Sequence, residues 1–569
     1  MNKKFELKLD QAAAQHRAGR PDLAEPVYRE LFEENPGSPE LNHLLGVIEL
    51  TKDRYAEAEV FIAQAIRRDA TQAKYHNTLG AVLRKAGRKQ EAIEAYQKAL
   101  QVEPDFIDAR HNLADVYLGM GKSQKAEHCI EKILDIEPDN IDALNNLAAL
   151  NMTNDRHDTA LDLLRHAVEL APDNGMVLTN LLKCLERKNL LAEASEVAFR
   201  LEAAGPDHVE GRLFAARIER RTGRENQAVA SLRRLIKDTV NTKIHYHALF
   251  ELGLVLDRIG QPEDAFDIFG QANALQKQRL PATVDAARYR SQIARDRNWL
   301  IPERFKIWED SIGEDTPAPV FLVGFPRSGV TLFEQVLRAH PDIVTTGEAS
   351  PLERLRNHIH QEGNYPECLN TASGQDIKKW QRLYQDYCHD ILTGPLDDRV
   401  MIDTMPLNIT EIGLINRILP RARIITAVRD PRDVCLSCFM QNFQPGDTLS
   451  YFNDLHTTAQ LYVQIMEFWQ HCRQHMALPC IEFRYEDLIA DFEATTRNVL
   501  DFLDVPWSDD IIRYRDGVLA RKITSASLRD VVNPMYTDAA GRWLRYQQHL
   551  EPVLELLEPY IGEFGYDAR

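Results

Sequence analysis

The chain has 569 residues, of which 44% are hydrophobic and 27% are charged, and its formal net charge is −18. This length is too great for one hydrophobic core, so we expect two or more domains. The acidic balance argues against a broad nucleic-acid surface, while a local basic pocket for a small anion stays compatible with it. No uncharged apolar run reaches about 18 residues and the start lacks the apolar core of a signal peptide, which predicts no membrane span and a cytoplasmic location.

Eight cysteines are scattered through the chain, which suits reduced thiols better than a disulfide framework. Cys435 and Cys438 form a C-x-x-C pair. Because no second pair lies near it in the sequence, we expect neither a zinc site nor any other bound metal.

A period of 34 residues organises the first half of the chain. It is kept by alanines, by prolines and by a second class of small residues. The alanines are Ala24, Ala58, Ala92, Ala126, Ala160, Ala194 and Ala228, the prolines are Pro36, Pro104, Pro138, Pro172 and Pro206, and the small residues are Gly46, Gly80, Ala114 and Ala148. Two antiparallel helices approach closely only where side chains are small, and proline ends the second helix. The pattern resembles the tetratricopeptide-repeat family over residues 5–280, in about eight repeats.

This resemblance implies an α-helical solenoid whose concave face binds a protein or peptide. Asn112, Asn145, Asn146 and Asn180 could lie on that face and hold a peptide backbone. They could equally be ordinary solvated residues, and the sequence leaves both readings open. The array could also serve dimerisation or only position the second domain.

The second half of the chain predicts an α/β domain. Residues 281–317 form a helical connection and a Pro-rich, charged linker, and the domain itself covers residues 318–565. Apolar, strand-like runs alternate with helical patterns, which predicts a parallel sheet with helices on both faces. The runs are Val320–Val323, Val400–Ile402, Ile424–Val428 and Cys480–Phe483.

The first of these strands leads into a glycine-bearing loop and a helix, at residues 324–331 with the sequence GFPRSGVT. Free backbone N–H groups and the positive end of a helix dipole make such a loop an anion cradle. The spacing is that of a P-loop, but Val330 stands where the nucleotide-binding lysine should be. Arg327 supplies a cation inside the loop instead, so we expect an anion-binding loop and no ordinary nucleoside triphosphatase.

A second anion site is predicted where the third strand ends. Arg429 leaves the strand, a helix starts at Asp430-Pro431, and Ser437 follows two helical turns later. The guanidinium and the hydroxyl could bind the same phosphate. Alternatively, Arg429 forms an ion pair with Asp430 or Asp433. Two anion sites on neighbouring strands suggest a nucleotide that carries phosphates at both ends.

These two motifs resemble those of sulfotransferases, in the right order and with the fitting spacing, and most closely the tyrosylprotein sulfotransferases and bacterial proteins that fuse tetratricopeptide repeats to such a domain. The resemblance implies 3′-phosphoadenosine 5′-phosphosulfate (PAPS) as the sulfuryl donor, a hydroxyl acceptor and no metal. Residues expected to bind the donor are Pro326, Arg327, Ser328, Gly329, Val330 and Thr331 at the 5′ end, Arg429 and Ser437 at the 3′ end, and Tyr485, Ser527 and Arg542 further along the chain.

The resemblance also implies the catalytic groups. Glu348, in the stretch HPDIVTTGE, matches the glutamate that takes the acceptor proton, with a surface or helix-capping carboxylate as the alternative. Arg327 would stabilise the charge that develops on the leaving phosphate. Two residues depart from the family pattern. Val330 replaces a threonine of the loop, and Thr404 replaces a lysine that reaches the transferring group.

The sequence therefore predicts a bacterial PAPS-dependent sulfotransferase whose repeats recruit a protein or peptide, with tyrosine as one acceptor. A glycan or a small hydroxylated metabolite fits the same residues. The alternative function is a repeat scaffold with a degenerate nucleotide-binding domain, which Val330 and Thr404 favour. A P-loop kinase is disfavoured by the missing lysine and by the lack of an evident magnesium-binding aspartate.

Overall fold

The computed structural model describes residues 3–154, 156–205, 207–240, 242–309, 318–347, 349–392, 399–444, 446–515 and 539–567. The chain divides into two compact units, one of residues 1–184 with 203–205 and the other of residues 185–202 with 206–569. None of the helices described in these ranges has the length and apolarity that crossing a membrane requires.

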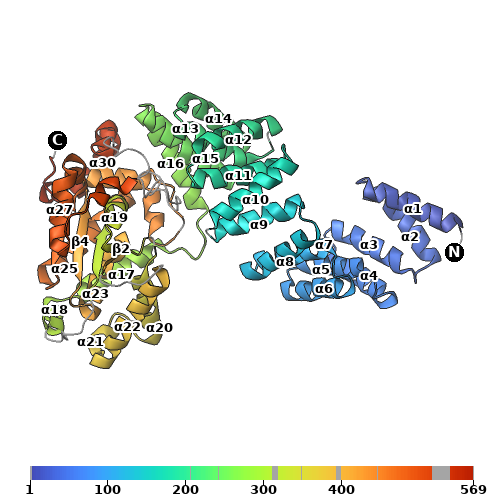
Figure 1. Ribbon diagram of the computed structural model, residues 1–569, viewed down its shortest axis with the longest axis horizontal. Coiled ribbons are helices and arrows are strands. Elements are labelled where there is room, and N and C mark those ends of the chain that lie inside the picture. Colours follow the sequence, from blue (N-terminus) through green and yellow to red (C-terminus); the bar gives the residue numbers. More distant parts are fainter. Residues whose placement is uncertain are drawn as a thin grey trace. The chain divides into compact units, whose positions relative to one another are not determined.

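Successive antiparallel helices build the first half of the chain, as the 34-residue period predicts (Figure 1). In chain order, these helices begin with α1 (Lys3–Arg17), α2 (Pro21–Glu34), α3 (Pro39–Thr51), α4 (Tyr55–Arg68), α5 (Ala73–Lys85), α6 (Lys89–Val102), α7 (Ile107–Leu118), α8 (Ser123–Ile136), α9 (Ile141–Thr153), α10 (His157–Leu170) and α11 (Gly175–Arg187). The array continues with α12 (Leu191–Ala204), α13 (Val209–Arg221), α14 (Glu225–Asp238), α15 (Lys243–Arg258) and α16 (Pro262–Gln278).

The periodic residues lie where two helices touch. Every alanine of the period is fully buried. A Cβ added to Gly80 of α5 would lie 2.5 Å from the ring of Tyr96 on α6, so only glycine leaves room for that ring. Pro104 stands two residues after the last residue of α6, where it prevents the helix from continuing. The helical solenoid predicted from the sequence is confirmed.

The second unit contains a five-stranded parallel sheet in the order β2-β3-β1-β4-β5. Its strands are β1 (Val320–Gly324), β2 (Ile343–Thr345), β3 (Val400–Asp403), β4 (Arg423–Val428) and β5 (Cys480–Arg484). Side chains of β1 alternate between two apolar cores: Phe321 and Val323 belong to one, Val320 and Leu322 to the other. The predicted α/β fold with both faces of the sheet covered is therefore confirmed (Figure 1).

Helices and 3-10 segments surround the sheet and fill the connections between strands. They are α17 (Ala286–Trp299), α18 (Pro302–Glu309), α19 (Val330–Arg338), α20 (Pro351–Glu362), α21 (Cys368–Thr371), α22 (Gly374–Ile391), η1 (Pro406–Glu411), α23 (Ile412–Ile418), α24 (Pro431–Phe439), η2 (Leu449–Asn453), α25 (Leu455–His475), α26 (Tyr485–Ala490), α27 (Phe492–Leu503), η3 (Asp509–Arg513), η5 (Arg542–Tyr546) and α30 (Gln547–Glu563).

The last repeat helices and the sheet share one hydrophobic core. Residues of α15 and α16, among them Phe250 and Phe269, belong to the same buried cluster as Phe321 of β1 and Leu461 of α25. Phe266 of α16 also stacks on Phe439 of α24, with ring centroids 4.9 Å apart. In the second unit the end of the repeat array is thus packed as part of the α/β domain.

A candidate anion-binding site at the ends of β1 and β4

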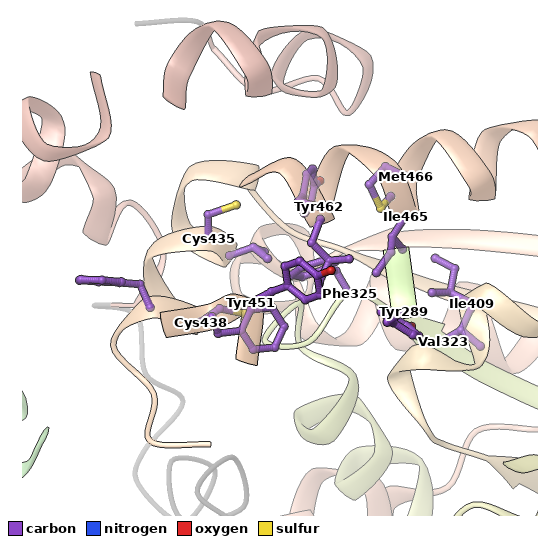
Figure 2. Packing of buried hydrophobic residues seen from close by; sticks show 14 of the residues in the cluster. Tyr289, Val323, Phe325, Ile409, Cys435, Cys438, Tyr451, Tyr462, Ile465 and Met466 are labelled. Carbon is purple, nitrogen blue, oxygen red and sulfur yellow. The ribbon is translucent and has the colours of Figure 1, made fainter. Parts of the chain in front are cut away.

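The first residues of the loop between β1 and α19 anchor it to the hydrophobic core. Phe325 points into the core toward Tyr462, with the two ring centroids 5.1 Å apart (Figure 2). Its ring centroid also lies 5.8 Å from that of Phe452. The thiol of Cys438 donates to the carbonyl oxygen of Pro326 at 3.4 Å. Cys438 is therefore buried against the loop, and burial holds the pKa of its thiol far above the usual range.

Two residues of this loop adopt the left-handed backbone region, Arg327 with φ +71° and Gly329 with φ +105°. The second precedes the first residue of α19, Val330, so the turn delivers the chain directly into the helix N-terminus. A Cβ on Gly329 would lie 2.8 Å from the ring of Tyr485. A side chain at Gly329 is thus disfavoured twice, by its φ and by the ring above it.

The two predicted anion motifs meet. Arg327 Nε donates to Ser437 Oγ at 3.0 Å, and Arg429 Nη1 donates to the carbonyl oxygen of Arg327 at 3.1 Å. This contact follows from the topology, because β1 and β4 are adjacent parallel strands whose carboxyl ends lie at the same edge of the sheet. The predicted loop and the predicted second site therefore form one basic cluster.

Of the two alternative ion pairs of Arg429, the structure contains the one with Asp433. Its Nη2 atom lies 3.8 Å from Asp433 Oδ2, beyond hydrogen-bond distance. Asp430 is engaged by Arg432, whose Nη2 lies 2.7 Å from its Oδ2. Within the described part of the chain, the buried atoms Ser328 Oγ and Arg429 Nε have no hydrogen-bond partner. A hydroxyl and a guanidinium N–H left in this way suit an anionic ligand.

Tyr485 forms one wall of this cluster. It is 7% exposed, and its ring lies over the guanidinium of Arg429 with Cζ 4.7 Å from the centroid. Burial raises the pKa of its hydroxyl, which the positive charges of Arg429, Arg327 and Arg542 partly oppose. The phenol therefore stays neutral and adds an aromatic face beside three cations.

A buried carboxylate binds the backbone on both sides of Arg542. Asp433, on α24 between Arg429 and Ser437, accepts the backbone N–H groups of Gly541 at 2.7 Å and Trp543 at 2.8 Å. Burial raises the pKa of Asp433 to about 6 although Arg429 opposes the shift. From the sequence, Asp433 is expected only as an ion-pair partner of Arg429. Its role in holding the segment that begins η5 depends on a contact 108 residues away and has no local signal.

The remaining predicted residues are placed as follows. Thr331 is half-buried in the first turn of α19. Thr404, which stands where the family has a lysine, donates its Oγ1 to the carbonyl oxygen of Gly347 at 2.8 Å. Glu348 and Ser527 lie outside the residues that the structure describes.

Two asparagine pairs link consecutive repeats of the first unit. Asn112 Nδ2 donates to Asn77 Oδ1 at 3.0 Å, and Asn180 Nδ2 donates to Asn145 Oδ1 at 2.8 Å. Three of the asparagines singled out from the sequence are therefore engaged with an amide of the repeat 35 residues before or after their own.

The fold and the site define the class of protein. It is a helical repeat array followed by a parallel α/β domain with a phosphate-type loop and a second basic site. Residues 319–509 match the sulfotransferase family model, and residues 15–82, 83–150 and 141–174 match tetratricopeptide repeat models. The chain thus carries tetratricopeptide repeats and a sulfotransferase family domain.

Two curated proteins share sequence similarity with long parts of the chain. The chain is similar to an uncharacterized protein of Aquifex aeolicus, with 27% identity over 388 residues that cover 65% of this chain and 48% of that protein. It is also similar to protein-tyrosine sulfotransferase A of Caenorhabditis elegans, with 24% identity over 270 residues that cover 44% of this chain and 67% of that protein. The chain spans about half the length of the first of these relatives.

Among solved structures, the chain is similar to a tetratricopeptide repeat protein from Parabacteroides merdae, with a TM-score of 0.34 and 18% identity. That match covers 44% of this chain and 93% of the other.

Proposed function

We propose that the second unit transfers a sulfuryl group from PAPS to a hydroxyl acceptor in the cytoplasm of a bacterium, and that the repeats recruit a protein or peptide carrying that hydroxyl. One observation carries the proposal: the Arg327 guanidinium donates to Ser437 Oγ and the Arg327 carbonyl oxygen accepts from Arg429, so the three residues meet beyond the ends of β1 and β4. The ligand that such a cluster fits is a nucleotide with a phosphate group at each end.

The donor would be held by residues with separate tasks. The loop 326–331 would bind the 5′-phosphosulfate through its N–H groups, Arg327 and the hydroxyl of Ser328. Arg429 and Ser437 would bind the 3′-phosphate, where the buried Nε and the hydroxyl offer hydrogen bonds. When bound, PAPS supplies the activated sulfuryl group and a phosphate leaving group.

The chain's own residues would then supply the proton chemistry and the charge. Glu348 would take the proton from the acceptor hydroxyl as its oxygen bonds to sulfur. Arg327, fixed by Ser437 at 3.0 Å, would stabilise the negative charge on the departing phosphate oxygen. Neither role needs a metal ion.

Calorimetric titration without metal tests the donor site. We expect the protein to bind adenosine 3′,5′-bisphosphate, the product of the proposed reaction, and not ATP. Arg429→Ala should weaken this binding about 10- to 100-fold, since a hydrogen bond to a charged group contributes about 1.5–3 kcal/mol. The matched control is Arg473→Ala, which removes an exposed arginine paired with Glu482 on β5. Equal affinity in the Arg429 variant and in wild type would remove Arg429 from the site.

Turnover tests the proposed base separately. Glu348→Gln should keep the affinity for the bisphosphate and lower the transfer of labelled sulfate from PAPS by about 100-fold or more. Retained turnover would exclude Glu348 from this role. Tyrosine peptides, glycans and small hydroxylated compounds should be screened as acceptors in the same assay.

A scaffold with a degenerate nucleotide site is the second candidate. It is favoured by Thr404, whose hydroxyl is engaged with the Gly347 carbonyl where the family has a lysine. Binding of the bisphosphate without transfer to any acceptor class would select this function, and so would the absence of binding. In the second case the repeats would be the working part of the protein.

A further inference from the structure

The short helix η5, which contains Arg542, is held between two buried carboxylates that come from different parts of the second unit. On one side, Asp433 of α24 accepts the N–H groups of Gly541 and Trp543. On the other side stands Asp257, which belongs to α15 in the repeat array and is 4% exposed. The segment that carries Arg542 is therefore fixed partly by a repeat helix.

The carboxylate of Asp257 faces three side chains of η5, and the backbone carbonyl oxygen of Asp257 accepts a further hydrogen bond from η5. Its Oδ1 accepts a hydrogen bond from the hydroxyl of Tyr546 at 2.7 Å and lies 3.1 Å from Arg545 Nη2. Its Oδ2 lies 3.8 Å from Arg542 Nε. Its carbonyl oxygen also accepts from Arg545 Nη1 at 2.9 Å. One aspartate of the repeat array thus faces two arginines and a tyrosine of η5.

The same repeat pair contacts the end of the helix that carries Ser437. Asn273 of α16 donates its Nδ2 to the carbonyl oxygen of Phe439, the last residue of α24, at 2.8 Å. Gln276 donates to the carbonyl oxygen of Phe443 at 2.8 Å. The carbonyl groups at a helix C-terminus lack partners within the helix, so Asn273 fixes the end of α24 and Gln276 fixes the segment that follows it. Both segments of the candidate 3′ site are therefore attached to α15 and α16.

We propose that Asp257 is a positioning residue for the donor site: it holds η5 so that the Arg542 side chain faces the ligand, and it thereby couples the last repeat to nucleotide binding. This inference rests on the proposed function, because it assumes that Arg542 contributes to binding a 3′-phosphate. It assigns to α15 and α16 a part in the donor site that neither the repeat pattern nor the sulfotransferase motifs indicate.

Positioning and simple electrostatics predict opposite results. Asp257 places a negative charge near the cluster, so its removal would strengthen anion binding if only charge mattered. If the carboxylate orients Arg542, its removal weakens binding instead. Asp257→Asn separates the two, because the amide oxygen can still accept from Tyr546, whereas the charge and the oxygen that faces Arg542 are lost. We expect the affinity for adenosine 3′,5′-bisphosphate to fall about tenfold, the effect of losing one charge-assisted contact.

A double-mutant cycle on the full chain tests whether Asp257 acts through Arg542. Bisphosphate affinity is measured for wild type, Asp257→Asn, Arg542→Ala and the double variant. We expect Asp257→Asn to have little effect once Arg542 is absent. Glu263→Gln is the matched control, since Glu263 joins the same repeat pair to His549 of α30 at 2.7 Å without touching η5. It should leave the affinity unchanged.

Amide hydrogen exchange on the wild-type protein gives a second test that needs no variant. Bisphosphate binding should slow exchange in η5 and also in the last turn of α15, but not in α13. Additive effects in the cycle, tighter binding by Asp257→Asn, or protection of η5 without α15 would each overturn the inference. If wild type itself does not bind the bisphosphate, the proposed function fails first and takes this inference with it, an outcome distinct from those three.

Discussion

Asp403 offers a sharp test of how burial controls the stability of the second unit. It ends β3, has no exposed surface and is surrounded by hydrogen-bond donors. Asn408 Nδ2 donates to its Oδ1 at 2.9 Å, and the hydroxyl of Tyr384 donates to its Oδ2 at 3.2 Å. Burial nevertheless dominates and raises its pKa from 3.8 to about 7. The perturbation is Asp403→Asn, which keeps the shape and removes the titration.

The sign and size of the effect follow from this shift. A carboxyl with a raised pKa contributes stability that is fully present below its unfolded pKa of 3.8 and is lost as the pH rises through about 7. The whole contribution is about 4 kcal/mol at 1.36 kcal/mol for each pKa unit. Because the unfolded chain is already ionised at pH 5, about 2–3 kcal/mol of it is lost between pH 5 and pH 8.

Urea unfolding followed by tryptophan fluorescence is the appropriate assay, since all six tryptophans belong to the second unit. We expect Asp403→Asn to gain about 2–3 kcal/mol over wild type on going from pH 5 to pH 8. Asp501→Asn, an exposed aspartate of α27, is the control and should show no such change. A difference between wild type and Asp403→Asn that stays constant with pH would show that Asp403 ionises normally and refute the reasoning.

Three further predictions concern packing and the loop. Gly80→Ala should destabilise the first unit by about 1–3 kcal/mol in thermal unfolding, because its Cβ would lie 2.5 Å from the Tyr96 ring. Gly329→Ala should abolish measurable bisphosphate binding in calorimetry. It should also lower the free energy of unfolding of the second unit by about 1–2 kcal/mol, because the φ of Gly329 is +105°. Asn273→Ala should cost the second unit about 1–3 kcal/mol in urea unfolding, since the buried carbonyl oxygen of Phe439 loses its donor.

Controls for these variants come from the same chain. Gly119→Ala, at a right-handed position whose added Cβ would meet nothing closer than 3.4 Å, should be nearly neutral in the first unit. Wild-type stability of Gly80→Ala would mean that the Tyr96 ring can move aside. Normal bisphosphate affinity of Gly329→Ala would show that the loop tolerates another backbone conformation. A neutral Asn273→Ala would imply that the Phe439 carbonyl finds a replacement donor.

Local patterns determined much of this protein in advance. The alanines and small residues of the 34-residue period predicted the helical array because close helix packing requires small side chains at fixed intervals. The apolar runs predicted four of the five strands. The glycine spacing of residues 324–331 predicted the loop between the first strand and the helix that follows it. β2 was not predicted, since a strand of three residues leaves no alternation to read in the sequence.

Only the tertiary structure decided which distant residues meet. The two basic motifs, 102 residues apart in Arg327 and Arg429, come together because β1 and β4 are neighbours in the sheet. The contact of Asp257 with η5 spans 289 residues at Tyr546 and involves side chains that carry no motif. Spacing along a helix or a loop is encoded locally, whereas the pairing of strands and the packing of a repeat against a domain depend on surfaces assembled from many segments.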